Sequence, residues 1–305
     1  MLFEYDAHLS WNLISRCNLD CKYCYTFGDP SKKTGEITRI DISSLMKTID
    51  KTGKIFNIHF IGGGEPFLVP NIVDACIEIT KRHYVGFNSN MITNKIEEFA
   101  EKIDPGRVSY INASCHIKEL ERVGLLDTWI DNFLMYKDRG FNIGAEEVAF
   151  PPLLKEAGRY RRFFRNGGIE LKFVPFSGEY NGKKYPRAYT KKEMKIFGIP
   201  KKGKDGTNKY NQYGKRCNAG YNFGFADKDG NIQPCPQINE SIGNLYGKIE
   251  FQSGIRRCPF DVCWCPLNVF DPHLFKKAVN GVKCSKNSEM KSNHISKFIS
   301  FIKNM

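Results

Sequence analysis

The chain has 305 residues, a net charge of +13 and eleven cysteines, and 41% of its residues are apolar. This length and composition suit a globular protein with room for one large domain and a smaller one. No stretch reaches the ~18 consecutive apolar residues that a membrane span requires. Glu4 and Asp6 stand where a signal peptide would carry basic residues. We therefore expect a cytoplasmic protein that does not associate with a membrane.

Apolar segments rich in β-branched and aromatic residues alternate with helical patterns in the first part of the chain. Six of these segments are predicted strands: 8–14, 58–63, 84–90, 108–114, 143–150 and 169–176. Asp41 and Asn71 are predicted N-caps of two of the helices between them. Repeated β-α units predict an α/β fold with a parallel sheet. Because six units are too few for a closed eight-fold barrel, we expect a partial (β/α)6 TIM-like barrel with ligands at the C-terminal ends of its strands.

The pattern changes after residue 180. We expect three parts: a barrel over 1–180, a basic linker with a short helix over 181–216, and a cysteine-rich domain over 217–305. The capping box of Thr190 and Glu193 begins the short helix. Asp229-Gly230 predicts the turn of a β-hairpin, and residues 294–305 predict an amphipathic C-terminal helix.

The first cysteine group is a C-x3-C-x2-C loop directly after the first predicted strand, formed by Cys17, Cys21 and Cys24. Without an export signal, and with an odd number of cysteines, metal binding is favoured over disulfides. Three thiolates can bind three corners of a cubane iron–sulfur cluster and leave one coordination position open for a ligand. The alternative is a zinc site that His8 or a distant cysteine completes.

This loop, with Tyr23 just before its last cysteine, resembles the signature of the radical S-adenosylmethionine (AdoMet) superfamily. A Gly-Gly-Gly-Glu-Pro turn at 62–66 resembles the same family's GGEP motif. The resemblance implies that the loop holds a [4Fe–4S] cluster whose open iron binds AdoMet. It also implies reductive cleavage of AdoMet to a 5′-deoxyadenosyl radical, abstraction of a hydrogen atom from a substrate carbon, and a flavodoxin or ferredoxin-type electron donor.

The same resemblance implies a set of AdoMet-binding residues, although the chain departs from the family pattern at two of them. Tyr23 would lie near the adenine and Glu65 would orient the methionine amino group. Ser89 stands in a Thr-Asn-Gly-like motif that reads Asn-Ser-Asn here, and Ser114 begins Ser-Cys-His where the family often has Ser-x-Asp. The implied residues are Tyr23, Gly62, Gly63, Gly64, Glu65, Ser89, Asn90, Asn112, Ser114 and Glu146, with Glu147 as the alternative to Glu146.

The second cysteine group comprises Cys217, Cys235, Cys258, Cys263, Cys265 and Cys284. Its hairpin with flanking cysteines resembles the twitch domain, a shorter relative of the SPASM domain, and implies an auxiliary [4Fe–4S] cluster. The implied ligands are Cys217, Cys235 and two or three of Cys258, Cys263 and Cys265. A surplus thiol, Cys265 or Cys284, is a candidate donor of a hydrogen atom to a substrate radical. The alternatives are a structural zinc site and a surplus thiol without a role.

The positive charge, dense between residues 155 and 216, favours an acidic partner or reflects a lysine-rich surface. We expect an acidic peptide or a phosphorylated or sugar-like small molecule as substrate, and we do not expect a nucleic acid. The predicted reaction is oxidation, cross-linking or epimerisation of a peptide or sugar-like substrate. One alternative is a carbohydrate or small-molecule dehydrogenase or epimerase. The alternative from another class is a non-enzymatic iron–sulfur or zinc protein that transfers electrons.

Overall fold

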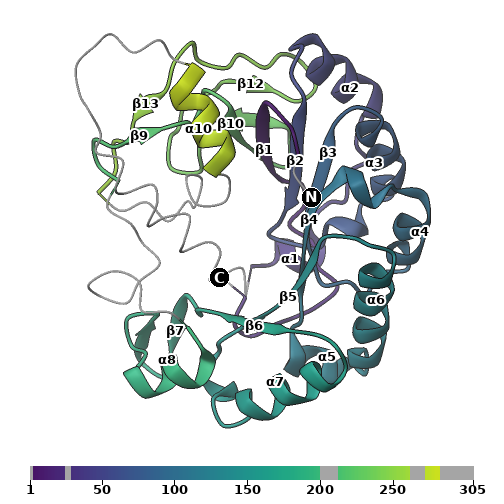
Figure 1. Cartoon of the computed structure of the whole chain (residues 1–305), viewed down its shortest axis with the longest axis vertical. Helices are drawn as coiled ribbons and strands as arrows, with labels where there is room; N and C mark the ends of the chain where they lie inside the picture. The colour runs from purple at the N-terminus through teal and green to yellow at the C-terminus, as the bar shows by residue number, and fades with distance from the viewer. Residues whose placement is uncertain (1–2, 25–28, 200–211, 262–271, 282–305) are drawn as a thin grey trace.

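A curved sheet with helices along its outer side dominates the computed structural model, which describes residues 3–24, 29–199, 212–261 and 272–281 (Figure 1). The strands of this sheet are β1 (Ala7–Asn12), β2 (Phe56–Ile61), β3 (Tyr84–Ser89), β4 (Val108–Ser114), β5 (Ile143–Val148), β6 (Leu171–Val174), β10 (Phe223–Ala226), β11 (Asn231–Gln233) and β12 (Gly243–Asn244). Their order is β12-β11-β10-β1-β2-β3-β4-β5-β6.

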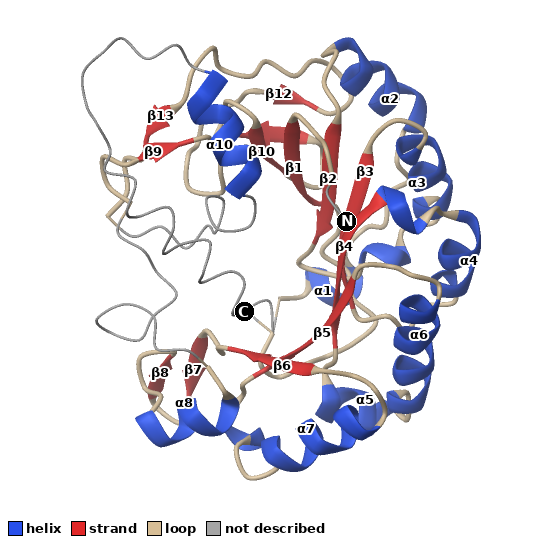
Figure 2. Ribbon diagram, in the orientation of Figure 1, coloured by secondary structure: helices blue, strands red, loops and turns tan. Residues whose placement is uncertain are grey.

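Helices connect the successive strands and cover one face of the sheet, as Figure 2 shows. They are α2 (Ile42–Lys51), α3 (Ile72–Thr80), α4 (Lys95–Lys102), α5 (Ile117–Val123), α6 (Leu126–Asp138) and α7 (Ala157–Asn166). The connections also contain the four-residue helix α1 (Ser31–Thr34) and the short 3-10 helices η1 (Pro66–Leu68), η2 (Pro105–Arg107) and η3 (Pro151–Leu153). Asp41 caps α2 by accepting the N–H of Ser44.

The six predicted strands are present as β1 to β6, and all neighbouring pairs among them are parallel. The prediction of a partial TIM-like barrel is therefore confirmed. Side chains alternate along the strands, as in β1, where Leu9 and Trp11 are fully buried while His8 and Ser10 are half-buried. The buried series packs beneath the helices, and the half-buried series lines the inner, concave face.

Aromatic rings fill the layer between the sheet and its helices. Phe87 of β3 stacks on Phe60 of β2 and on Phe67 of η1, with ring centroids 4.9 and 4.8 Å apart. Phe99 of α4 meets Phe67 and Phe87 edge-on. All four rings are almost completely buried, so this layer makes a large hydrophobic contribution to stability. It also fixes the strand ends from which the loops of the inner face emerge.

The hairpin predicted at Asp229-Gly230 is present as β10 and β11, and Gly230 has the positive φ of 80° that the turn requires. The structure adds that β10 pairs in parallel with β1, so this hairpin extends the barrel sheet. A two-stranded sheet joins β9 (Arg216–Cys217) to β13 (Arg256–Arg257).

Three smaller elements complete the described part of the chain. The predicted basic linker contains a small hairpin, β7 (Gly178–Tyr180) and β8 (Lys183–Tyr185), followed by α8 (Lys191–Phe197) with its expected capping box. The helix α10 (Pro272–Gly281) lies near β10 (Figure 1), and Asn222 donates to the Leu274 carbonyl at 3.1 Å. The domain boundaries at 180 and 216 stay predictions, and the predicted helix 294–305 lies outside the described residues. None of the described helices is long and apolar enough to cross a membrane.

Candidate active site

The loop after β1 carries Cys17, Cys21 and Cys24 to the C-terminal edge of the sheet. Cys21 is buried and the other two cysteines are half-buried. The N–H of Leu19 donates to the Cys17 sulfur at 3.5 Å, a contact that stabilises a thiolate ligand. Among the described residues, no three His, Cys, Asp or Glu side chains stand together in a metal-binding arrangement. Three thiols on one short loop, with an N–H donor to one sulfur, nevertheless supply the donor set that a cubane cluster needs.

The Gly-Gly-Gly-Glu-Pro turn after β2 packs directly against this cysteine loop. A Cβ atom on Gly64 would lie 2.0 Å from the carbonyl oxygen of Arg16, so only glycine fits there. The N–H of Glu65 donates to that same carbonyl at 2.9 Å. The N–H of Gly63 donates to the Asn12 side chain at 3.0 Å. The turn and the cysteine loop are therefore one packed unit.

Glu65 is a buried carboxylate that joins the ends of β2 and β3. It accepts the Ser89 hydroxyl at 2.9 Å, the Asn90 N–H at 2.7 Å and the Phe67 N–H at 3.1 Å. Burial raises its pKa to about 7, against the opposing effect of these hydrogen bonds. The structure thus brings three of the predicted site residues together.

Asn90 continues this contact to the cysteine loop. Its side-chain amide donates to Asn18 Oδ1 at 2.6 Å and lies 3.9 Å from the Cys17 sulfur. Hydrogen bonds from amides to a ligand sulfur tune and orient iron–sulfur ligands. Asn90 therefore links the ends of β2 and β3 to the predicted cluster ligand.

A second buried carboxylate holds the other side of the loop. Glu119 of α5 accepts the backbone N–H of Asp20 at 2.8 Å. Both of its oxygens also accept hydrogen bonds from Arg122, at 2.7 and 2.8 Å. The Glu119 side chain is only 8% exposed, so the ion pair orients a carboxylate that the loop backbone depends on.

Tyr23 is buried between the loop and the ends of β4 and β5. Its hydroxyl donates to Glu147 at 3.1 Å and lies 3.0 Å from His116 Nδ1. Glu147 also accepts the N–H groups of Ile117 and Val148, both at 2.7 Å. Burial raises the pKa of Glu147 to about 8, and burial together with the Glu147 charge raises the pKa of Tyr23. The phenol thus anchors the loop to two strands.

Comparison with known proteins identifies this arrangement. Residues 11–156 match the Radical SAM superfamily. Over these residues the chain is a member of the radical SAM superfamily. Membership implies a [4Fe–4S] cluster that acts with AdoMet, and the three thiols of the loop suit such a cluster. No curated protein matches the chain in sequence.

Solved structures with this fold include radical SAM proteins with bound AdoMet. Native anSMEcpe with bound AdoMet is 17% identical, with a TM-score of 0.56 over 78% of each chain. SuiB of Streptococcus suis bound to AdoMet is 15% identical, with a TM-score of 0.51 over 79% of this chain and 64% of SuiB. SuiB bound to its precursor peptide SuiA gives a TM-score of 0.53 at 14% identity, over 83% of this chain and 66% of SuiB. At these identities the likeness establishes the fold.

On the inner face of the radical SAM barrel, the predicted residues of β4 and β5 meet. Asn112 donates to Glu146 at 2.8 Å, and Ser114 lies directly opposite Glu146 in the strand pair. Burial raises the pKa of Glu146, while Asn112 and Lys172 act to lower it. The Asn112 Oδ1 atom is buried and has no hydrogen-bond partner among the described residues. It is an acceptor suited to a hydroxyl or ammonium group of a ligand.

Two histidines lie on the inner face: His8, which the sequence offered only as a ligand of the alternative zinc site, and His59, which was not predicted as a site residue. The rings of His8 and His59 stack with centroids 6.0 Å apart. His8 bonds to Ser10, and His59 bonds to Asn88 at 3.1 Å. Burial lowers the pKa of His8 to about 3 and also lowers that of His59, so both rings are neutral. They place uncharged hydrogen-bonding groups on the wall of the radical SAM barrel.

Three cysteines of the second group are described, and they lie close together. Cys217 of β9 pairs with Arg256 of β13, two residues before Cys258. Cys217 and Cys235 pack in one small apolar cluster. Burial and the charge of Cys258 raise the pKa of Cys235, while hydrogen bonds from the backbone after Cys235 act to lower it. Backbone donors beside neighbouring thiols suit metal-bound thiolates. Cys263, Cys265 and Cys284 lie outside the described residues.

Sequence reasoning missed the residues that hold the cysteine loop, chiefly Glu119, and it ranked Glu147 behind Glu146. The helix α5, which carries Glu119, was not predicted, although Ile117 and Leu120 show helical spacing and Gly124 has the positive φ of a helix end. A local sequence pattern would have located the helix. The pairing of its glutamate with Asp20, 99 residues away, is a long-range contact that no local pattern contains.

Proposed function

We propose that this chain is a radical SAM enzyme that cleaves AdoMet at the Cys17–Cys24 loop and modifies a peptide. The observation that carries the proposal is the contact of Gly64 with the Arg16 carbonyl, which joins the Gly-Gly-Gly-Glu-Pro turn to the cysteine loop. When bound, the cluster supplies the electron that splits AdoMet and yields the 5′-deoxyadenosyl radical, which takes a hydrogen atom from the substrate. The chain's own residues position the reactants.

Each of these residues has a distinct task in the proposal. Cys17, Cys21 and Cys24 would hold three irons. The backbone of residues 62–64 lies against the cysteine loop and would leave room for a close approach of AdoMet, because glycines carry no side chain. Glu65 fixes this backbone through its bonds to Ser89 and Asn90. Holding two reactants in the reactive geometry accounts for a large part of the rate enhancement in many enzymes.

The acceptors of β4 and β5 complete the AdoMet site in this proposal. Asn112 and Glu146 form one bonded pair on the inner face. The unpartnered Asn112 oxygen accepts a ligand hydroxyl or ammonium group. The Tyr23 hydroxyl is buried and donates to Glu147. In this proposal it positions the loop, and the contact of Tyr23 with the adenine stays a prediction.

A peptide is favoured as the substrate over a sugar by the structural relatives. SuiB was solved with its precursor peptide SuiA, and anSMEcpe with the Cp18Cys peptide. The neutral wall of His8 and His59 offers donors and acceptors of the kind that backbone amides pair with. We also propose that Cys217, Cys235 and Cys258, with one further cysteine, hold an auxiliary [4Fe–4S] cluster that accepts the electron left by the substrate radical.

The test is AdoMet cleavage by anaerobically reconstituted protein with dithionite as reductant. We expect 5′-deoxyadenosine from the wild-type protein and none from Cys24→Ala, because this variant cannot hold the cluster. Cys76→Ala is the matched control, since Cys76 is buried in α3 and takes no part in the proposed site. Equal yields from Cys24→Ala and the wild-type protein would falsify the proposal.

A further inference from the structure

The barrel sheet contains very few charged side chains. Its strands β1 to β4 have no aspartate, glutamate, lysine or arginine, and neither have β10, β11 and β12. The histidines of its inner face, His8 and His59, are neutral because burial lowers the pKa of each. The charged residues of the nine described strands are Glu146 and Glu147 of β5 and Lys172 of β6. Lys172 is therefore the one cation in the described strands of this sheet.

The side chain of Lys172 projects from the inner face of the sheet. Its neighbour Phe173 is buried on the helix side, where its ring packs against that of Phe197 with centroids 5.3 Å apart. Because successive residues of a strand point to opposite faces, Lys172 lies on the inner face. The register agrees, since Lys172 is directly opposite Glu146, which bonds to Asn112 on that face.

The ammonium group of Lys172 is available to a ligand. The residue is exposed, and within the part of the chain that the structure describes no ion pair or hydrogen bond engages it. Glu146 is drawn away from it, because Asn112, its partner at 2.8 Å, belongs to β4 on the far side of β5. All three N–H donors of Lys172 therefore remain for a bound group.

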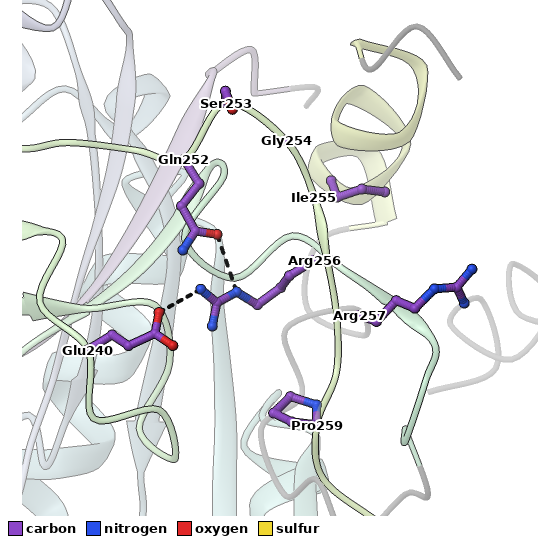
Figure 3. Close-up of a pocket in the computed structure, with 8 residues that line it drawn as sticks. All are labelled: Glu240, Gln252, Ser253, Gly254, Ile255, Arg256, Arg257 and Pro259. Carbon is purple, nitrogen blue, oxygen red and sulfur yellow. Dashed lines mark hydrogen bonds and ion pairs between the residues drawn. The ribbon is translucent and has the colours of Figure 1, made fainter. Parts of the chain in front are cut away.

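The arginines beside the second cysteine group differ from Lys172, because they are already engaged. Arg256 binds Glu240 at 2.7 Å and Gln252 at 3.2 Å (Figure 3), and its side chain is only 19% exposed. Arg257 donates to the Gly214 carbonyl at 2.8 Å. Both arginines line a hollow of about 550 Å³, where a carboxylate of the protein itself balances part of the positive charge. An unengaged cation lies on the inner face of the barrel instead.

Lys172 also lies beside the proposed AdoMet site. Ser114 of β4, Glu146 of β5 and Lys172 of β6 form one row across three neighbouring strands. Adjacent strands are ~4.8 Å apart, so the first and last strands of this row are about 10 Å apart. In the proposed function Asn112 of β4 binds AdoMet on this part of the face. A group bound by Lys172 therefore lies next to the AdoMet.

We propose that Lys172 is a specificity-determining residue, which binds the side-chain carboxylate of an aspartate or glutamate in the peptide substrate. The inference rests on the proposed function, since it names the kind of peptide that the same site takes. A carboxylate that enters this face meets one unengaged cation on a wall that is otherwise almost uncharged. Because charges of opposite sign fix the register of two partners, this ion pair places one residue of the peptide beside AdoMet.

The test is equilibrium dialysis of the reconstituted holoenzyme with AdoMet and three libraries of short peptides. Each peptide is acetylated and amidated at its ends, has randomised uncharged flanks, and carries aspartate, asparagine or lysine at its centre. We expect the wild-type protein to bind the aspartyl library about three- to fivefold more tightly than the asparaginyl one, and added KCl to reduce this preference. Lys172→Met should abolish the preference, and Lys172→Glu should favour the lysyl library instead.

Lys51→Met is the matched control, because Lys51 is exposed at the end of α2, in the outer layer of helices (Figure 1). This variant should keep the wild-type preference for the aspartyl library. The iron content and circular dichroism of all variants show whether they fold and hold their clusters.

Equal retention of the aspartyl and asparaginyl libraries by the wild-type protein would overturn the inference. A preference that survives in Lys172→Met would overturn it as well. That second result is expected if Lys172 only keeps β6, the last strand of the sheet, from pairing with another chain. Dithionite-driven cleavage of AdoMet is measured on the same wild-type preparation without peptide. A failure there refutes the proposed function, and the dialysis still tests Lys172 separately.

Discussion

Glu147 is a buried carboxylate, and burial makes its charged form energetically unfavourable. It accepts hydrogen bonds from two backbone N–H groups and from the Tyr23 hydroxyl. Burial nevertheless dominates and raises its pKa from 4.5 to about 8. Glu147 holds together the cysteine loop, the end of a strand and the start of a helix. Its charged form nevertheless destabilises the fold, so the site positions its residues at a cost in stability.

This shift predicts a pH dependence of stability. Between pH 4.5 and about 8, the folded protein keeps a proton on Glu147 that the unfolded chain has lost. Stability therefore falls as the pH rises through this window, and levels off above it. Glu147→Gln removes that contribution, so the stability of the variant relative to the wild-type protein should improve between about pH 5 and about pH 8. Urea unfolding of the two cluster-free proteins at both pH values measures this difference in the free energy of unfolding.

Comparison with the wild-type protein cancels the titrations that both proteins share. Glu97→Gln is the matched control, because Glu97 is exposed on α4, and it should follow the wild-type protein at both pH values. Identical pH slopes for Glu147→Gln and the wild-type protein would contradict the assignment of the shift to this carboxylate.

At the scale of elements, the site depends on the contact between the turn after β2 and the loop after β1. Gly64→Ala would place a Cβ atom 2.0 Å from a backbone oxygen of Arg16, and a backbone atom cannot move aside as a flexible side chain does. We expect the two segments to separate and dithionite-driven cleavage of AdoMet to fall about 10- to 100-fold in a folded protein. Gly247→Ala is the control, since nothing lies within 4 Å of its added atom. Similar yields from the two variants would show that the contact does not position AdoMet.

Local patterns were sufficient to predict these elements and insufficient to predict how they meet. The strand containing Leu9 and Trp11, and the glycines around Gly64, are recognisable because periodicity and turn chemistry are properties of neighbouring residues. The parallel pairing of β10 with β1, as in Leu9 with Gly224, joins segments more than two hundred residues apart. The bond from Glu119 to Asp20 is of the same kind. Both depend on tertiary packing, so the sequence carried no local signal for them.

At the scale of the whole molecule, the β10–β11 hairpin connects the two cysteine groups to one sheet. β10 lies beside β1, which leads into the Cys17–Cys24 loop, and Phe223 at the start of β10 packs with Cys235. His8 of β1 stacks on Phe223 with centroids 5.3 Å apart. The second group is therefore built onto the edge of the radical SAM barrel. Electron transfer between the two cysteine groups would therefore take place over a distance that the sheet fixes.

This arrangement predicts that the two groups bind iron independently. Cys235→Ala combined with Cys258→Ala should lose about half of the iron of the reconstituted protein and keep its dithionite-driven formation of 5′-deoxyadenosine. Replacing Cys17, Cys21 and Cys24 should lose the other half together with all cleavage. Each result follows because a cluster needs its own thiolates, whereas the barrel sheet does not depend on either cluster for its hydrophobic core.

Metal analysis gives the iron and zinc content of each variant, and electron paramagnetic resonance of the reduced proteins detects the clusters that remain. Unchanged iron in the double variant, or zinc in place of the lost iron, would exclude an auxiliary iron–sulfur cluster while leaving the first group's assignment untouched.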